Sequence, residues 1–205
     1  MSEPRFRRRK EDRPQEITEA AMAAFAEKGY AATKVEDVAK RAGVSKGLLY
    51  LYFKTKEELF KAVIRSFVVP RIDELSEIID RSELTSEEFL RGPFLDFVKT
   101  LPGSPISKLI RLMIAEGPKH PDLLEFYWDN VVSRALAALS LVLDRGVEKG
   151  EFRPTMVNEL PHLLIMPVLF SVIFKLLFAD RAPDTDKLIE TQLDLLIAHM
   201  KGDAS

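Results

Sequence analysis

The stretch Thr33–Phe53, TKVEDVAKRAGVSKGLLYLYF, contains two short helical patterns separated by a turn. Thr33 and Glu36 have the spacing of a capping box, which predicts where the first helix begins. Apolar residues then recur at the i, i+3, i+4 and i+7 positions of one helix face, namely Val35, Val38, Ala39 and Ala42. The first half of the stretch therefore predicts a short amphipathic helix.

Gly43 predicts the turn that follows, because a residue without Cβ adopts a left-handed conformation at little cost. Ser45 is a favoured N-cap residue and predicts a second helix over residues 46–53. A helix, a glycine-containing turn and a second helix form the layout of a helix-turn-helix.

The second helix has an unusual surface. At about 100° per residue, Leu49 and Phe53 share the side that would pack against the first helix. The opposite side and its margins carry Lys46, Gly47, Leu48, Tyr50, Leu51 and Tyr52. Another helix could cover these residues. Alternatively duplex DNA could cover them, because phenol hydroxyls reach phosphates and leucine meets a thymine methyl. Periodicity alone leaves both explanations open.

A longer motif favours duplex DNA over another helix as the partner of this surface. The run V-x-D-V-A-x-x-A-G-V-S-x-G-x-L-Y-x-Y-F-x-x-K-E-x-L spans Val35–Leu59 and extends upstream to A-x-x-x-F-A-E-K-G-Y at Ala21–Tyr30. It resembles the signature of the TetR family of bacterial transcriptional regulators. Beyond the first third of the chain, the resemblance is limited to helix pattern and length.

The resemblance implies a cytoplasmic, homodimeric, ligand-responsive DNA-binding regulator, a repressor that is nucleoid-associated when bound to DNA. A helix-turn-helix DNA-binding domain is expected over 11–71, with the motif itself at about 34–53. An effector-binding and dimerisation domain is expected over 82–201, with the last two helices pairing with those of a second copy. The DNA-binding residues that the resemblance implies are Thr33, Ser45, Lys46, Gly47, Leu48, Tyr50, Tyr52 and Lys56.

One position departs from the family pattern. Leu48 stands where many relatives carry a polar side chain that reads a base, and leucine can neither donate nor accept a hydrogen bond. The base sequence that the helix reads is therefore not predictable by analogy.

Composition agrees with this reading. The 205 residues suffice for one domain or two small ones, and the absence of cysteine fits a reducing cytoplasm. The net charge of −2 hides an asymmetry: residues 1–60 hold 13 Lys and Arg against 10 Asp and Glu, whereas the remainder holds 17 against 22. The more basic end is the end with the motif.

The fold class predicted is all-α, with about nine helices. Residues 1–13 form an arginine-rich segment, read either as a solvated tail or as an arm that follows phosphates. Capping residues Thr55 and Glu58 open a long helix to about residue 80, which Pro70 should break. Further helices are predicted over about 14–28, 86–100 (disturbed by Gly92-Pro93), 106–116, 122–149, 160–178 and 185–199.

The segment Leu160–Phe178, LPHLLIMPVLFSVIFKLLF, approaches the length of a membrane span. It contains two prolines, a histidine and Lys175, and no second span accompanies it. Burial in a globular core or a subunit interface is the alternative that we favour.

No catalytic constellation can be assembled. The three histidines are far apart and lack metal-ligand spacing, and neither a nucleophile elbow nor a phosphate-binding loop occurs. The chain is predicted to be neither an enzyme nor a protein with a cofactor or metal. Apolar cavities between helices often bind ligands, and the candidates for lining an effector pocket, each also readable as core, are Phe97, Met113, Tyr127, Trp128, His162, Met166 and Phe170.

Two other functions remain open. A regulator of the same fold could work without a small effector, through protein partners or as an activator. A small helical enzyme or ligand carrier could have kept a relic head. The expected partners are thus an operator in double-stranded DNA, a second copy of the chain and a small lipophilic effector.

Overall fold

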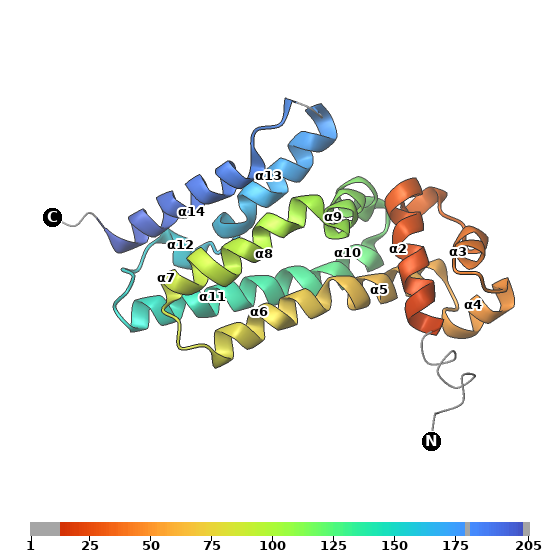
Figure 1. Cartoon of the computed structure of the whole chain (residues 1–205), viewed down its shortest axis with the longest axis horizontal. Coiled ribbons are helices and arrows are strands. Elements are labelled where there is room, and N and C mark those ends of the chain that lie inside the picture. Colours follow the sequence, from red (N-terminus) through yellow and green to blue (C-terminus); the bar gives the residue numbers. More distant parts are fainter. Residues whose placement is uncertain (1–12, 179–180, 203–205) are drawn as a thin grey trace, which may run out of the picture. The chain divides into compact units, whose positions relative to one another are not determined.

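The part of the chain that the structure describes consists of helices joined by short turns and loops. This structure is a computed structural model that describes residues 13–178 and 181–202, in which no β-strand occurs, so the all-α prediction is confirmed. The predicted arm lies outside these residues except for Arg13. The α-helices (Figure 1) are α2 (Arg13–Ala32), α3 (Val35–Arg41), α4 (Lys46–Tyr52), α5 (Lys56–Phe67), α6 (Val69–Arg81), α7 (Ser86–Phe89), α8 (Leu95–Thr100), α9 (Pro105–Glu116), α10 (Pro121–Tyr127), α11 (Ser133–Glu148), α12 (Met156–Glu159), α13 (His162–Phe178) and α14 (Thr185–Lys201).

Proline marks two of the breaks that the sequence predicts. α5 ends at Phe67 and α6 begins at Val69, directly before Pro70. A π-helical segment, Leu90–Phe94, contains Pro93 and separates α7 from α8. Because proline lacks an N–H and its ring crowds the preceding turn, a regular helix does not continue through either position.

The chain divides into two compact units. One contains Met1–Pro70 and Leu112–Tyr127, and the other contains Arg71–Arg111 and Trp128–Ser205. We call them the head unit and the body unit. The segment Leu112–Tyr127 belongs to the head unit by its contacts, although the sequence places it within the predicted effector domain.

The core of the head unit is built around an apolar stripe of α2. Ile17, Ala21 and Phe25 are at most 1% exposed. Phe60 of α5, also fully buried, lies edge-to-face against Phe25 and Tyr30, with ring centroids 5.2 and 5.3 Å apart. The face of α5 that packs inward therefore includes Phe60.

The turn between α3 and α4 has the backbone geometry that Gly43 permits. Gly43 has φ +64°, and its N–H donates to the carbonyl of Lys40 at 3.2 Å. The N–H of Val44 donates to the carbonyl of Ala39 at 3.0 Å. These two bonds form a Schellman motif, which fixes the direction in which α4 leaves α3.

One of the predicted capping boxes is incomplete. Thr55 accepts a hydrogen bond from the N–H of Glu58 at 3.0 Å, as expected for an N-cap. The carboxylate of Glu58, however, accepts from the N–H of Lys54 at 2.7 Å rather than from that of Thr55. The start of α5 is therefore where the sequence predicts it, with a different reciprocal bond.

The core of the body unit gathers residues from α6, α7, α8, α11, α13 and α14. α13 and α14 pack side by side (Figure 1). Phe89, Leu143 and Ile197 are among its fully buried side chains. Exposed ion pairs join α14 to the region of α7 and α8, including Arg91 with Asp194 at 2.5 Å. Because such pairs are worth little in water, apolar burial stabilises this unit.

Helix α13 does not have the properties of a membrane span. Across the residues that the structure describes, no helix combines the length and the hydropathy that a bilayer crossing needs. Its Leu164 and Val168 are buried in the core of the body unit, and Val172 is also buried. This agrees with the globular alternative favoured from the sequence.

Candidate nucleic-acid interface

Helix α4 is held against the head unit by one side and leaves the other open. Leu49 is 0% exposed, and Ser45 caps the helix by accepting the N–H of Leu48 at 3.1 Å. The opposite surface is accessible: Ser45, Lys46, Gly47 and Leu51 are exposed, and Leu48, Tyr50 and Tyr52 are half-buried. Among the described residues, most of the outer face of this helix stays accessible. An exposed helix of this size fits the major groove of B-DNA.

Lys46 is oriented by α3. Its ammonium forms an ion pair with the carboxylate of Glu36 and lies 5.8 Å from the centroid of the Tyr50 ring. The hydrogen bond from Lys46 lowers the pKa of the Glu36 carboxyl, and the same bond raises the pKa of Lys46. Both groups are exposed, so solvent screens the pair and a phosphate can compete for the lysine.

Thr33 has a role other than the one that the sequence predicts. The N-cap of α3 is Lys34, without a side-chain cap, so the capping box of Thr33 and Glu36 is wrong. The Thr33 hydroxyl donates to the carbonyl of Gly29 at 2.6 Å, with that of Ala24 3.2 Å away. Thr33 is 1% exposed, so its side chain joins α2 to the start of α3 and is not available to a phosphate.

Lys56 is likewise used inside the head unit. Its ammonium donates to the carbonyls of Tyr30 at 2.9 Å and Ala31 at 3.2 Å, and lies 4.5 Å from the centroid of the Tyr30 ring. Burial lowers the pKa of Lys56. The lysine satisfies carbonyls at the end of α2, where a cation is also favoured by the helix dipole. The phosphate contact predicted for it would have to displace these bonds, so we omit Lys56 from the proposed interface.

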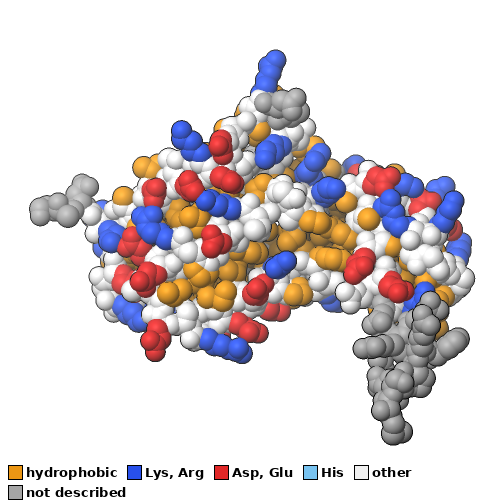
Figure 2. Space-filling model, in the orientation of Figure 1, with side chains coloured by type: hydrophobic (Ala, Val, Ile, Leu, Met, Phe, Trp, Pro, Cys, Tyr) orange, Lys and Arg blue, Asp and Glu red, His pale blue; other side chains and the backbone are white. Residues whose placement is uncertain are grey.

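Charged side chains of both signs surround the described part of the head unit. On the face seen in Figure 2, basic and acidic side chains are interspersed, in keeping with the net charge of −2. In the head unit two exposed cations pair with acidic groups across α2 and α3, Lys28 with Asp37 at 2.8 Å and Arg41 with Glu27 at 2.6 Å.

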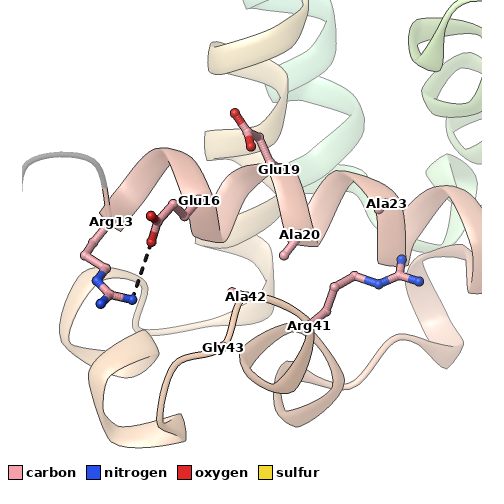
Figure 3. Close-up of a pocket in the computed structure, with 8 residues that line it drawn as sticks. All are labelled: Arg13, Glu16, Glu19, Ala20, Ala23, Arg41, Ala42 and Gly43. Atoms are coloured by element: carbon pink, nitrogen blue, oxygen red, sulfur yellow. Dashed lines mark ion pairs between the residues drawn. The ribbon is translucent and has the colours of Figure 1, made fainter. Parts of the chain in front are cut away.

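An open groove of about 570 Å³ lies beside the turn of the helix-turn-helix. Figure 3 shows α2 forming one wall and the end of α3 with Gly43 forming the other. Ala20, Arg13 and Glu16 of α2 line the groove, and Arg13 forms an ion pair with Glu16 at 3.4 Å. The groove is polar and opposite charges offset one another in it, so it does not resemble an apolar effector pocket.

Sequence reasoning missed the contacts that attach Leu112–Tyr127 to the rest of the head unit. The ring of His120 lies edge-to-face against Tyr30, with centroids 4.7 Å apart. Phe126 of α10 lies under two cations of α5, 5.6 Å from Lys61 and 4.8 Å from Arg65. These partners are about sixty to ninety residues apart in sequence, so no local pattern predicts them.

The structure separates the seven effector-pocket candidates. Met113 and Tyr127 lie in the head unit, and the other five lie in the body unit. Trp128 is exposed, as are three residues of α13 that follow one another at four-residue intervals, His162, Met166 and Phe170. The side chains of these four candidates are therefore accessible in the single chain, and their role in an effector pocket stays a prediction.

The remaining three candidates are at least partly buried. Met113 is 5% exposed, Phe97 packs against the body core, and Tyr127 is half-buried. Burial raises the pKa of Tyr127 to about 12, so its phenol stays protonated and can donate a hydrogen bond. A groove of about 310 Å³ on α6 and α11 is lined by none of the seven candidates.

A three-helix head with an exposed second motif helix defines a helix-turn-helix DNA-binding regulator. Residues 17–63 match the family described as "Bacterial regulatory proteins, tetR family", and residues 90–196 match "Tetracyclin repressor-like, C-terminal domain". The chain belongs to the TetR family of bacterial regulatory proteins.

Individual relatives agree with this assignment. The Fatty acid metabolism regulator protein of Bacillus subtilis is 25% identical, with 92% of this chain and 97% of the relative covered. The HTH-type transcriptional repressor KstR2 of Mycobacterium tuberculosis is 29% identical, covering 73% and 74%. A crystal structure of a TetR-family regulator from Mesorhizobium loti superimposes with a TM-score of 0.74 at 25% identity, covering 96% of this chain and 98% of that one.

Proposed function

We propose that this protein is a ligand-responsive transcriptional repressor that binds a pseudo-palindromic operator as a homodimer in the bacterial cytoplasm. The observation that carries the proposal is the exposed outer face of α4, in a chain whose two parts both match TetR-family domains. Two copies of α4 would enter successive major grooves about one helical turn apart. The proposed DNA-binding domain spans 11–71 and the proposed effector and dimerisation domain spans 82–201. No catalytic step belongs to this proposal.

The residues proposed to contact DNA are those of the exposed face of α4 and its cap. Ser45, Tyr50 and Tyr52 are assigned to phosphates, which set the register of the helix on the duplex. Lys46, Gly47 and Leu48 are assigned to base edges. Lys46 would exchange its carboxylate partner Glu36 for a phosphate or a guanine edge.

Replacing Lys46 with alanine should weaken operator binding about 10- to 100-fold, because each half-site of the dimer loses one charge-assisted contact. Lys201→Ala is the matched control: its side chain is 51% exposed and ion-paired, against 55% for Lys46, but it lies at the end of α14. The measurement is an electrophoretic mobility shift on the fragment upstream of the protein's own gene. Binding to no genomic fragment at low salt would overturn the regulator proposal.

The same titration tests the effector. The Bacillus subtilis relative is named for fatty acid metabolism, so fatty acyl compounds are the first class of lipophilic effector to add. Release of DNA in their presence supports a ligand-responsive repressor, since a ligand shifts the equilibrium only by its differential affinity for the two states. DNA binding that no lipophilic compound changes would favour the same-fold regulator without a small effector.

The homodimer is supported by an exposed apolar face on α13. It consists of six side chains that are 39–65% exposed, Met166, Leu169, Phe170, Ile173, Leu176 and Leu177. Leu195 of the neighbouring α14 is 64% exposed. A face this long and free of charge marks a protein interface, and a second copy of the same helix pair would bury it about a two-fold axis.

Ile173→Glu should raise the dissociation constant of the dimer at least about 100-fold, because a two-fold interface buries the new carboxylate twice. Leu141→Glu on α11 is the control, since Leu141 is 52% exposed against 41% for Ile173 but lies off this face. Sedimentation equilibrium measures the change. A dimer of unchanged affinity in the Ile173 variant would exclude α13 as the interface.

A further inference from the structure

The outer face of α4 exposes apolar side chains where hydrogen-bonding side chains would ordinarily read bases. Leu51 is 65% exposed, and Leu48, three residues earlier, is half-buried on the same side. Residues three apart on a helix are neighbours. Leu49, which points the other way, is 0% exposed and needs no further partner.

Gly47 gives a second, independent observation. A Cβ placed on Gly47 would meet no neighbouring atom of the described residues within 4 Å, and its φ is not positive. Neither packing nor backbone geometry within the chain requires glycine there, although glycine in a helix costs about 1 kcal/mol relative to alanine. Gly47 precedes Leu51 by one turn, so both lie at the centre of the open face. A bound partner that approaches the backbone closely explains both features.

Only one apolar group lines the major groove of DNA, the C5-methyl group of thymine. Leucine cannot exchange hydrogen bonds with a base edge, so this methyl is the group that it can contact favourably. Lys46 beside the leucines is cationic and suits a polyanionic partner. The chemistry of this face therefore selects duplex DNA with thymine at the positions that the leucines reach.

We propose that Leu48 and Leu51 read thymine methyl groups in the major groove, with Gly47 allowing the backbone to come close. The operator half-site then contains thymines that are recognised by shape and apolar contact, with Lys46 as the neighbouring hydrogen-bonding reader. This inference rests on the proposed function and specifies the DNA sequences that the same face accepts.

The test uses an operator duplex selected from genomic fragments by the full-length protein. Each thymine of the half-site is replaced in turn by deoxyuridine, which keeps base pairing and removes only the methyl group. Loss of one buried methyl contact in each half-site should weaken binding about 3- to 10-fold. Leu51→Ala should bind the unmodified operator more weakly and lose most of its sensitivity to deoxyuridine at one position, since the two changes remove the same contact.

Leu141→Ala is the matched control, an exposed leucine distant from α4 in sequence and in the other unit, and it should keep the full deoxyuridine effect. Equal binding of all deoxyuridine duplexes, or equal sensitivity in Leu51→Ala and the unchanged protein, would overturn the inference while leaving the regulator proposal in place. Failure to select any fragment would instead overturn the regulator proposal. The two failures are therefore distinguishable.

Discussion

Phe60→Ala should lower the free energy of unfolding of the head unit by about 3–5 kcal/mol and abolish DNA binding at growth temperature. Phe60 is 0% exposed and stands in contact with the rings of Phe25 and Tyr30. Alanine would leave a cavity among side chains from α2 and α5 that cannot collapse without moving both helices. Because small domains are stable by only about 5–15 kcal/mol, such a loss unfolds a sizeable fraction of the molecules.

Urea denaturation followed by tyrosine fluorescence measures this effect, since all four tyrosines, Tyr30, Tyr50, Tyr52 and Tyr127, lie in the head unit. Phe60→Leu is the control, because it keeps most of the side-chain volume and should cost less than about 1.5 kcal/mol. An unchanged midpoint in Phe60→Ala would show that the aromatic cluster does not hold the head together.

The second large effect concerns Gly146 in α11, where alanine should destabilise the body unit by about 1–3 kcal/mol. A Cβ at this position would lie 2.3 Å from Cδ2 of Phe152 and 3.1 Å from Cβ of Ser86. Phe152 is 4% exposed and belongs to the body core, so its ring has little room to move away. This expected loss of stability is opposite in sign to the effect of helix propensity alone, which favours alanine over glycine by about 1 kcal/mol.

Gly92→Ala provides the comparison, because a Cβ at Gly92 meets nothing within 4 Å and its φ is not positive. This substitution should change the free energy of unfolding by no more than about 1 kcal/mol in either direction. Thermal denaturation of both variants is the measurement. A Gly146→Ala protein as stable as the Gly92→Ala protein would mean that the close contact with Phe152 is relieved without cost.

The DNA-contacting face shows how far sequence reasoning reaches. Periodicity placed Leu49 inward, and Ser45 and Gly43 set the cap and the turn, because each of these signals depends on neighbouring residues. Thr33 and Lys56 were assigned by resemblance, and the structure gives them other partners. Their hydrogen-bond acceptors, Gly29 for Thr33 and Tyr30 for Lys56, lie in α2, where tertiary packing brings them close.

The sequence by itself determined the all-α class, the helix-turn-helix and the positions at which proline and glycine end helices, since these depend on local backbone preferences and helical period. Tertiary structure decided which apolar residues are core and which are surface. Phe60 is buried and Phe170 is exposed, although both are phenylalanines in helices. It also placed Leu112–Tyr127 in the head unit, because contacts between distant segments follow from packing and leave no local signature in the chain.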